Sequence, residues 1–280
     1  MAARKKKLIG AVKPRLQNTP LKGESKVQDV IDLAELISMP LMPWQEHVLR
    51  DALTVSKDGM FIRKTCLLLV ARQNGKTHLT RMLILAHLLK WGTKNIIIAS
   101  SNRAMALDTF RQVAQVFEGN ENLMALVKAI RYANGTECIE MKTGQRLDIV
   151  AATRDGSRGR TAGALFLDEA REWSEEAYRA AMPVTRAIPS AQTWITSNAG
   201  DAFSTVLNGL RERALANPPK TFGFYEYSAE PHCGIYDRKG WAQANPALGY
   251  TITEETLEES VATSPIENTR TEMLCQWVSS

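Results

Sequence analysis

The stretch Leu67-Leu68-Leu69-Val70-Ala71-Arg72-Gln73-Asn74-Gly75-Lys76-Thr77 decides the fold of this 280-residue chain. It begins with a continuous apolar run, which is typical of a central parallel strand covered on both faces. A polar turn follows, ends in Gly-Lys-Thr, and leads into a helical pattern that stops near Trp91-Gly92. A strand, a turn of this kind and a helix in this order predict a phosphate-binding loop.

The residues of this loop have distinct expected tasks. Backbone N–H groups turn toward the phosphates, Lys76 lies near the β and γ oxygens, and the Thr77 hydroxyl holds Mg²⁺. The common pattern G-x-x-x-x-G-K-[ST] has glycine where this chain has Val70, and Arg72 enters the loop instead. The predicted nucleotide-binding residues of the loop are Arg72, Gln73, Asn74, Gly75, Lys76 and Thr77.

Helical and strand patterns alternate from residue 27 onward. Further strands are expected at 95–99, 137–141, 146–150, 164–167 and 193–196, of which 137–141 and 146–150 form a hairpin across Thr143-Gly144. Helices are expected over 27–37, from Pro43 onward, over 104–117 and around 174–181. Alternating strands and helices predict an α/β fold, a mostly parallel sheet flanked by helices.

Composition places the chain among ordinary soluble globular proteins. It is 44% hydrophobic and 23% charged, and no apolar run approaches the roughly 20 residues that a membrane span needs. The basic N-terminus lacks the apolar core of a secretion signal, so we expect a cytosolic protein without a membrane partner. Four scattered cysteines without C-x-x-C spacing predict neither a disulfide framework nor a zinc site.

The net charge of +5 is concentrated in a tail. Residues 1–26 carry eight Lys and Arg against one Glu, whereas residues 225–280 carry three against nine acidic residues. The tail has no hydrophobic face, which predicts disorder, and it serves either DNA contact or solubility. We therefore expect a disordered tail over 1–26, a core over 27–230 and a C-terminal segment over 231–280.

An acidic pair supplies the second half of the predicted site. The apolar run Ala164-Leu165-Phe166-Leu167 ends in Asp168-Glu169, which places two carboxylates at the edge of the sheet where α/β folds bind ligands. Asp168 is expected near Mg²⁺, and Glu169 is expected to take the proton of the water that attacks the γ-phosphate. An acidic pair alone is more often a helix N-terminal feature; the preceding phosphate loop favours the catalytic interpretation.

Two further segments join the pattern. Thr196, Ser197 and Asn198 end another apolar strand, so they are expected beside the loop, where they sense the γ-phosphate or simply begin a turn. Before the loop, Gln45 offers an amide that both donates and accepts, as the adenine edge requires. Its alternative role is that of a solvated helix residue.

These segments together resemble the ATPase domain of the tailed-phage terminase large subunit, a motor that packs viral DNA into a capsid. The family's adenine-contacting stretch matches Pro43-Trp44-Gln45, its arginine-containing loop without the first glycine matches 72–77, its acidic pair matches Asp168-Glu169, and its coupling motif matches 196–198. The stretches 244–249 and 274–278 are similar to the segment that follows this fold. The resemblance implies a RecA-like P-loop NTPase of the ASCE type that uses ATP and Mg²⁺.

The resemblance also implies what the whole protein contains and meets. Full terminase subunits continue into an RNase H-like nuclease domain, so we expect 231–280 to lead toward such a domain and no nuclease residue within this chain. The implied partners are double-stranded DNA, the portal, the small terminase subunit and further copies in a ring, a pentamer during packaging. The implied location is the host cytoplasm.

Two arginines compete for the charge that develops on the γ-phosphate. Arg72 lies inside the loop and would act in its own subunit. Arg158 precedes Asp168 by ten positions, where the resembled family carries an arginine thought to reach the neighbouring subunit, with Arg160 as its substitute. Their alternative role is that of loop charges that face DNA.

Two other functions stay open on the sequence. A helicase-like DNA-dependent ATPase shares the sheet and the acidic pair, but it would normally bring a second similar domain and Asp-Glu-x-His or Asp-Glu-x-Asp, whereas this chain reads Asp168-Glu169-Ala170-Arg171. A DNA-binding scaffold with a degenerate nucleotide site conflicts with the intact Lys76 and Thr77. The segment Ser100-Ser101-Asn102-Arg103 is a candidate for DNA contact or for a helix cap.

Overall fold

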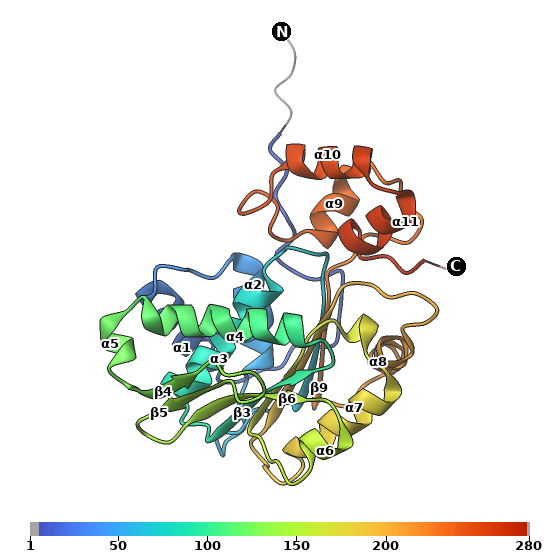
Figure 1. Cartoon of the computed structure of the whole chain (residues 1–280). Coiled ribbons are helices and arrows are strands. Elements are labelled where there is room, and N and C mark those ends of the chain that lie inside the picture. Colours follow the sequence, from blue (N-terminus) through green and yellow to red (C-terminus); the bar gives the residue numbers. More distant parts are fainter. Residues whose placement is uncertain (1–5, 279–280) are drawn as a thin grey trace.

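A central sheet divides the protein into two layers of helices in a computed structural model that describes residues 6–278 (Figure 1). Over these residues the sheet is nine-stranded, in the order β1-β9-β2-β8-β7-β3-β6-β5-β4. The strands from β9 to β6 in this order run parallel, and β1, β5 and β4 join antiparallel at the edges. The strands are β1 (Leu16–Gln17), β2 (Thr65–Leu69), β3 (Asn95–Ser100), β4 (Val127–Arg131), β5 (Cys138–Met141), β6 (Arg146–Ala151), β7 (Ala164–Leu167), β8 (Gln192–Ser197) and β9 (Phe222–Glu226).

The apolar run of β2 feeds both layers, as the pleat of a strand requires. Leu68 belongs to the core under the first group of helices, whereas Leu67 and Leu69 belong to the core under the second. The first group comprises α1 (Val27–Leu36), α2 (Pro43–Ala52), α3 (Lys76–Leu89), α4 (Arg103–Glu118) and α5 (Glu121–Met124). The second comprises α6 (Arg154–Ser157), the short turn η1 (Ala170–Glu172), α7 (Glu175–Ala181), η2 (Met182–Thr185) and α8 (Thr205–Leu215).

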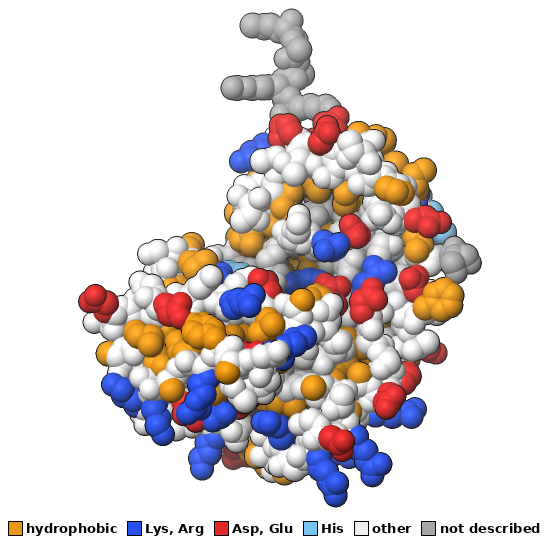
Figure 2. Space-filling view, in the orientation of Figure 1, with side chains coloured by type: hydrophobic (Ala, Val, Ile, Leu, Met, Phe, Trp, Pro, Cys, Tyr) orange, Lys and Arg blue, Asp and Glu red, His pale blue; other side chains and the backbone are white. Residues whose placement is uncertain are grey.

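A small C-terminal lobe lies against one end of this sandwich (Figure 1). It contains α9 (Arg238–Ala244), α10 (Glu254–Thr263), α11 (Ile266–Asn268) and the π-helical turn η3 (Thr269–Met273). Trp241, Leu257 and Leu274 are buried in the same apolar cluster as the second face of the sheet. The space-filling view shows a notch between this lobe and the core (Figure 2).

The expectation of a disordered tail is wrong for residues 6–26; residues 1–5 lie outside the described chain. Backbone N–H groups of Gly10 and Ala11 donate to the carbonyls of Leu248 and Ala242 at 2.8 and 2.9 Å. β1 then pairs with β9, and the Arg15 guanidinium binds Glu226. The tail lacks a hydrophobic face of its own, but the lobe and the sheet edge supply partners for its backbone.

The predicted fold class is confirmed, and the predicted strands are found within a few residues of their expected bounds. The hairpin across Thr143-Gly144 is confirmed, since β5 and β6 pair antiparallel. β1, β4 and β9 were not predicted. Within the described chain no helix is both long and apolar enough to cross a membrane.

Candidate functional site

The loop between β2 and α3 depends on the absence of a side chain at Gly75. This residue forms the N-cap of α3 with a φ of 109°, in the left-handed region that glycine adopts most readily. A Cβ atom at Gly75 would lie 2.7 Å from Nε2 of Gln45 and 2.9 Å from Cε of Met42. Both the backbone conformation and the close approach of α2 therefore require glycine here.

Lys76 and Glu169 lie 93 residues apart in the sequence and meet in the structure. Nζ of Lys76 lies 3.5 Å from Oε1 of Glu169, and the Lys76 side chain is buried. The cause is topological, because β8 alone separates β2 from β7 and the loops after parallel strands reach the same edge of the sheet. The structure thus brings the phosphate loop and the acidic pair together.

The backbone at Glu169 adopts a conformation that non-glycine residues seldom take. Its φ and ψ are both 51°, which costs on the order of 1 kcal/mol and persists only where the surroundings fix it. The neighbouring groups do fix it: the Trp173 indole donates to the Asp168 carbonyl at 2.8 Å, and the Glu169 N–H donates to Oδ1 of Asp168 at 2.8 Å. This turn aims the Glu169 carboxylate at Lys76.

Asp168 has one carboxylate oxygen in use and one open. Oδ1 accepts the Glu169 N–H and, at 2.7 Å, the Thr196 hydroxyl, whereas no hydrogen bond from residues 6–278 reaches Oδ2. Mg²⁺ prefers oxygen ligands and binds proteins through one or two carboxylates plus substrate phosphates. The donors offered by Asp168 and by the Thr77 hydroxyl, in the first turn of α3, fit this ion in kind.

Thr196, Ser197 and Asn198 end β8 and connect three parts of the protein. Besides the bond from Thr196 to Asp168, Oγ of Ser197 accepts the Arg171 N–H at 3.1 Å. Nδ2 of Asn198 donates to the Thr271 carbonyl at 3.4 Å, and its Oδ1 is buried without a partner in the described chain. The three residues thus link the acidic pair to the C-terminal lobe.

The phosphate loop itself is bound to the same lobe. The buried Asn74 side chain donates to Oδ1 of Asn245 at 2.9 Å and accepts the Ala247 N–H at 3.0 Å. Arg72 pairs with Glu272 twice, since its N–H donates to the Glu272 carbonyl at 2.9 Å and Nη1 lies 3.0 Å from Oε1. Two loop positions therefore hold the lobe at the edge of the sheet.

Gln45 is buried, and both ends of its amide already have partners. Oε1 accepts the Met42 N–H at 2.8 Å and closes a capping box on α2, while Nε2 donates to the Gly75 carbonyl at 3.0 Å. Gln45 therefore touches the phosphate loop, as its predicted role requires. It is not the solvated helix residue of the alternative interpretation.

Arg158 and Arg160 lie apart from the loop, in the exposed segment that follows α6. Figure 1 shows α6 at the end of the molecule away from the C-terminal lobe, and Figure 2 shows Lys and Arg side chains along that end. Among the described residues neither guanidinium has a hydrogen-bond or ion-pair partner. The structure thus does not bring Arg158 to the loop of its own chain.

The segment after β3 acts locally as a helix cap. Oδ1 of Asn102 accepts the Ala104 N–H at 3.0 Å and begins α4, and Arg103 binds the buried carboxylate of Glu137. Thr109 and Phe110 of the same helix are buried. The cap interpretation is therefore confirmed for Asn102.

Sequence reasoning missed several residues of this region. Asn245, Thr271 and Glu272 bind the loop and the end of β8, and Trp173 supports the Asp168-Glu169 turn. Polar residues in a segment without strong periodicity give no local signal of such contacts. Only the likeness of 244–249 to the terminase pattern pointed to this segment.

The fold and the site first define a broad class, an α/β protein with a phosphate loop and an acidic pair at the carboxyl edge of a parallel sheet. Residues 67–279 match the family described as terminase large subunit, T4likevirus-type, N-terminal. The chain belongs to this family. No match was found among curated protein sequences.

Solved structures share the fold. The HK97 bacteriophage large terminase is similar with a TM-score of 0.77 and 20% identity, over 91% of this chain and 56% of that chain. The Thermus phage P74-26 large terminase ATPase domain is similar with a TM-score of 0.61 and 17% identity, over 88% and 98%. The large terminase of another thermophilic bacteriophage, in complex with ADP, gives 0.54 and 14%, over 77% and 48%. The chain thus spans about half the length of the HK97 protein.

Proposed function

We propose that this chain is the ATP-hydrolysing motor part of a larger protein that drives double-stranded DNA into a viral procapsid. The observation that carries the proposal is the meeting of Lys76 with Glu169 beside an open oxygen of Asp168. A phosphate-binding cation, a metal-binding carboxylate and a base at one point are what hydrolysis of a nucleoside triphosphate requires.

In this proposal, the loop from Arg72 to Thr77 holds the phosphates and Glu169 acts as the base. Lys76 exchanges its contact with Glu169 for the β and γ oxygens when ATP binds, which frees the carboxylate to orient the attacking water and take its proton. Thr77 and Asp168 would hold Mg²⁺. When bound, this ion neutralises charge that develops on the phosphates.

Arg72 is the candidate for charge stabilisation within the same chain. Its partner Glu272 is exposed, and exposed ion pairs are worth roughly 0–1 kcal/mol, so Arg72 can leave Glu272 for a phosphate at little cost. Gln45 serves the site by holding Gly75, and contact with adenine would replace one of the two bonds that its amide makes.

Arg158 is the candidate for charge stabilisation across a subunit boundary, with Arg160 as its substitute. The support is that both are exposed and unpaired among residues 6–278 and lie away from their own loop. A role across a boundary requires copies in a ring, for which we propose a pentamer during packaging. Thr196, Ser197 and Asn198 would carry the change at the γ-phosphate into the lobe, since they touch both Asp168 and Thr271.

The remaining assignments concern the whole protein. We propose ATP and Mg²⁺ as cofactors, the portal and the small terminase subunit as partners, the host cytoplasm as the location, and an endonuclease domain in the same protein outside this chain. The domain division is proposed as a core over 27–230 and an ATPase-associated segment over 231–280, with residues 6–26 packed on both.

ATP hydrolysis with and without double-stranded DNA tests the proposal, on this chain and on the full-length protein. The expected result is Mg²⁺-dependent phosphate release that DNA stimulates in the full-length protein. Absence of hydrolysis in both proteins would reject the motor function. Hydrolysis coupled to strand separation, read with a labelled duplex, would favour the helicase-like alternative.

A further inference from the structure

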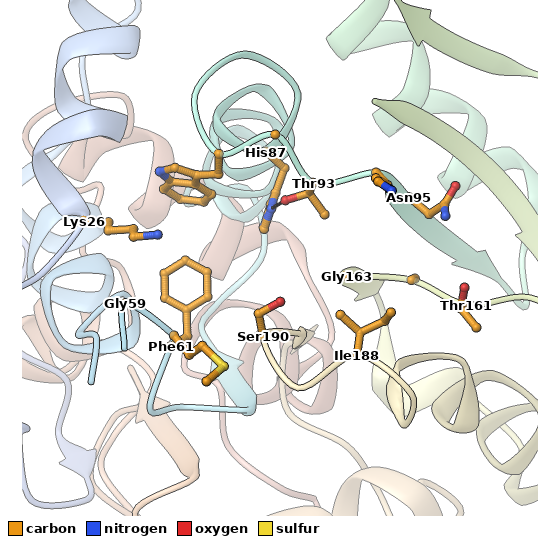
Figure 3. A pocket seen from close by; sticks show the side chains of 15 residues that line it. Lys26, Gly59, Phe61, His87, Thr93, Asn95, Thr161, Gly163, Ile188 and Ser190 are labelled. Carbon is orange, nitrogen blue, oxygen red and sulfur yellow. Dashed lines mark hydrogen bonds between the residues drawn. The ribbon is translucent and has the colours of Figure 1, made fainter. Parts of the chain in front are cut away.

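A second cavity lies at the opposite end of α3 from the phosphate loop (Figure 3). Its volume is about 400 Å³, within the range of about 300–1,000 Å³ that small-molecule sites occupy. It is bordered by the last turn of α3 and by residues just before β3, β7 and β8. Since α3 has 14 residues, its two ends are about 20 Å apart, and this cavity is distinct from the proposed nucleotide site.

One wall of the cavity is aromatic and carries an ordered positive charge. The Lys26 ammonium lies 5.3 Å from the centroid of the Phe61 ring and 5.9 Å from that of Trp91. The two rings pack edge to face with their centroids 5.4 Å apart. Outside the cavity, the Trp91 indole donates to Asp29 at 2.9 Å, which fixes the ring. These contacts hold the ammonium at the mouth of an apolar wall.

The opposite side supplies neutral polar groups. Thr93, Asn95, Thr161 and Ser190 offer hydroxyl or amide groups from four loops (Figure 3). A second lysine, Lys94, also borders the space, and the described lining contains no carboxylate. A cavity with two ammonium groups, several hydrogen-bond donors and no acid selects against cations and in favour of anions.

His87 provides a second, independent observation. Its ring is buried and lines the cavity, Nδ1 lies 2.7 Å from the Thr93 hydroxyl, and Nε2 has no partner in the described part of the chain. Burial lowers the pKa of His87 to about 3, with the positive charge of Lys26 as a further cause. The ring is therefore neutral at pH 7. A buried polar atom without a partner requires an explanation, such as a bound ligand.

We propose that this cavity binds a small organic anion that carries a carboxylate or phosphate on a flat apolar body. The anionic group lies at Lys26 and Lys94, among the hydroxyls, and the body lies on Phe61 and Trp91. The chemistry is shared by aromatic carboxylates and aromatic phosphate esters, and separate titrations distinguish them. This site is independent of the proposed ATPase function.

The test uses phenylacetate and phenyl phosphate as probes on the intact chain. Each is titrated while the imidazole nitrogen signals of the four histidines are followed by NMR, with the His87 signals assigned from His87→Gln. Phenylacetamide controls for the body without the charge, and inorganic phosphate controls for the charge without the body. We expect saturable shifts of the His87 signals with at least one aromatic anion at or below about 10 mM.

Substitutions then locate the binding. Lys26→Met should weaken the aromatic anion about tenfold or more, as expected for loss of a charge-assisted hydrogen bond. Lys22→Met, which removes an exposed lysine outside the cavity lining, is the matched control and should change nothing. Melting temperatures confirm that both variants fold, and ATP affinity should be the same in both.

The proposal is overturned by any of three results. The first is no saturable shift at His87 with either aromatic anion. The second is binding of phenylacetamide or inorganic phosphate as tight as that of the aromatic anions. The third is displacement of the anion by ATP together with loss of binding in Lys76→Ala, which would place the anion at the phosphate loop.

Discussion

At the scale of single residues, the site rests on a few buried contacts that the sequence predicted only in part. The sequence indicated Lys76, Asp168 and Glu169 because apolar runs precede them and parallel strands end at a common edge. It contains no sign that Glu169 adopts a left-handed conformation or that Trp173 donates to the Asp168 carbonyl. Such contacts arise from the tertiary path of a turn, which local patterns do not encode.

Glu169→Gln should retain ATP binding and lose hydrolysis. The amide keeps the shape of the side chain but takes no proton, so a general-base contribution of roughly 10²–10⁴ disappears. Phosphate release under saturating ATP measures the loss, and calorimetry measures binding. Glu172→Gln, which alters an exposed carboxylate three positions on, is the control. Near-normal turnover of Glu169→Gln would remove Glu169 from the mechanism.

Acidification below pH 6.5 should destabilise the fold through two buried histidines. The folded-state pKa of His87 is lowered to about 3 and that of His78 to about 4, in both cases chiefly by burial. Between these values and the ordinary pKa of about 6.5, the unfolded chain binds more protons, so the free energy of unfolding falls as pH falls. The limiting slope is about 1.4 kcal/mol per pH unit for each group.

Urea unfolding at a series of pH values between 7 and 5 measures this slope. His87→Gln removes the titrating ring, and its amide can still bond with Thr93. The slope should therefore decrease in His87→Gln by up to one proton's contribution. An unchanged slope in this variant would show that His87 is protonated in the folded state.

At the scale of elements, the phosphate loop and the C-terminal lobe form one bonded unit. β2, α3 and β7 were predictable because their apolar runs are continuous or periodic. β9 was not, since its last residue Glu226 is a buried acid whose partners Arg15 and Arg211 come from distant elements. The short helices of the lobe and the two-residue strand β1 have too few residues to show a period.

The pair formed by Asn74 and Asn245 should account for a measurable part of this attachment. Asn74→Ala leaves Oδ1 of Asn245 and the Ala247 N–H without their partner, which should cost about 1–3 kcal/mol of unfolding free energy. Asn134→Ala, at an exposed turn position, should change it by less than about 0.5 kcal/mol.

A double-mutant cycle with Asn245→Ala then isolates the contact. Residues that share a hydrogen bond are expected to show a coupling of at least about 0.5 kcal/mol. Urea unfolding of the four proteins supplies the values. Strict additivity would mean that the loop and the lobe are held together by other contacts.

At the scale of the whole molecule, the two candidate arginines lie at different ends. Arg72 is bonded to the lobe beside the loop, whereas Arg158 follows α6 on the exposed end (Figure 1). This separation could not be predicted from the sequence, where both precede Asp168 without a distance. It makes the two roles testable, because one acts within a chain and the other requires a neighbour.

Mixing Arg158→Ala protein with Glu169→Gln protein should restore ATP hydrolysis if Arg158 acts on a neighbour. The second protein supplies the arginine and the first supplies the base, so some mixed boundaries contain both. The mixture is measured on full-length protein with portals and DNA present. Arg72→Ala mixed in the same way should give no rescue. Absence of rescue by Arg158→Ala despite demonstrated mixed assembly would leave Arg72 alone as the stabilising cation.

The most direct test of the central claim is the affinity of this chain for ATP with Mg²⁺, measured by calorimetry on the unmodified protein, Lys76→Ala and Lys90→Ala. Lys76 contacts phosphate in the ground state and in the transition state, so its loss should weaken binding about tenfold or more. Lys90 is exposed at the other end of the same helix and should leave the affinity unchanged. Equal affinity of all three proteins, or no binding by any, would contradict the assignment of the loop as a nucleotide site.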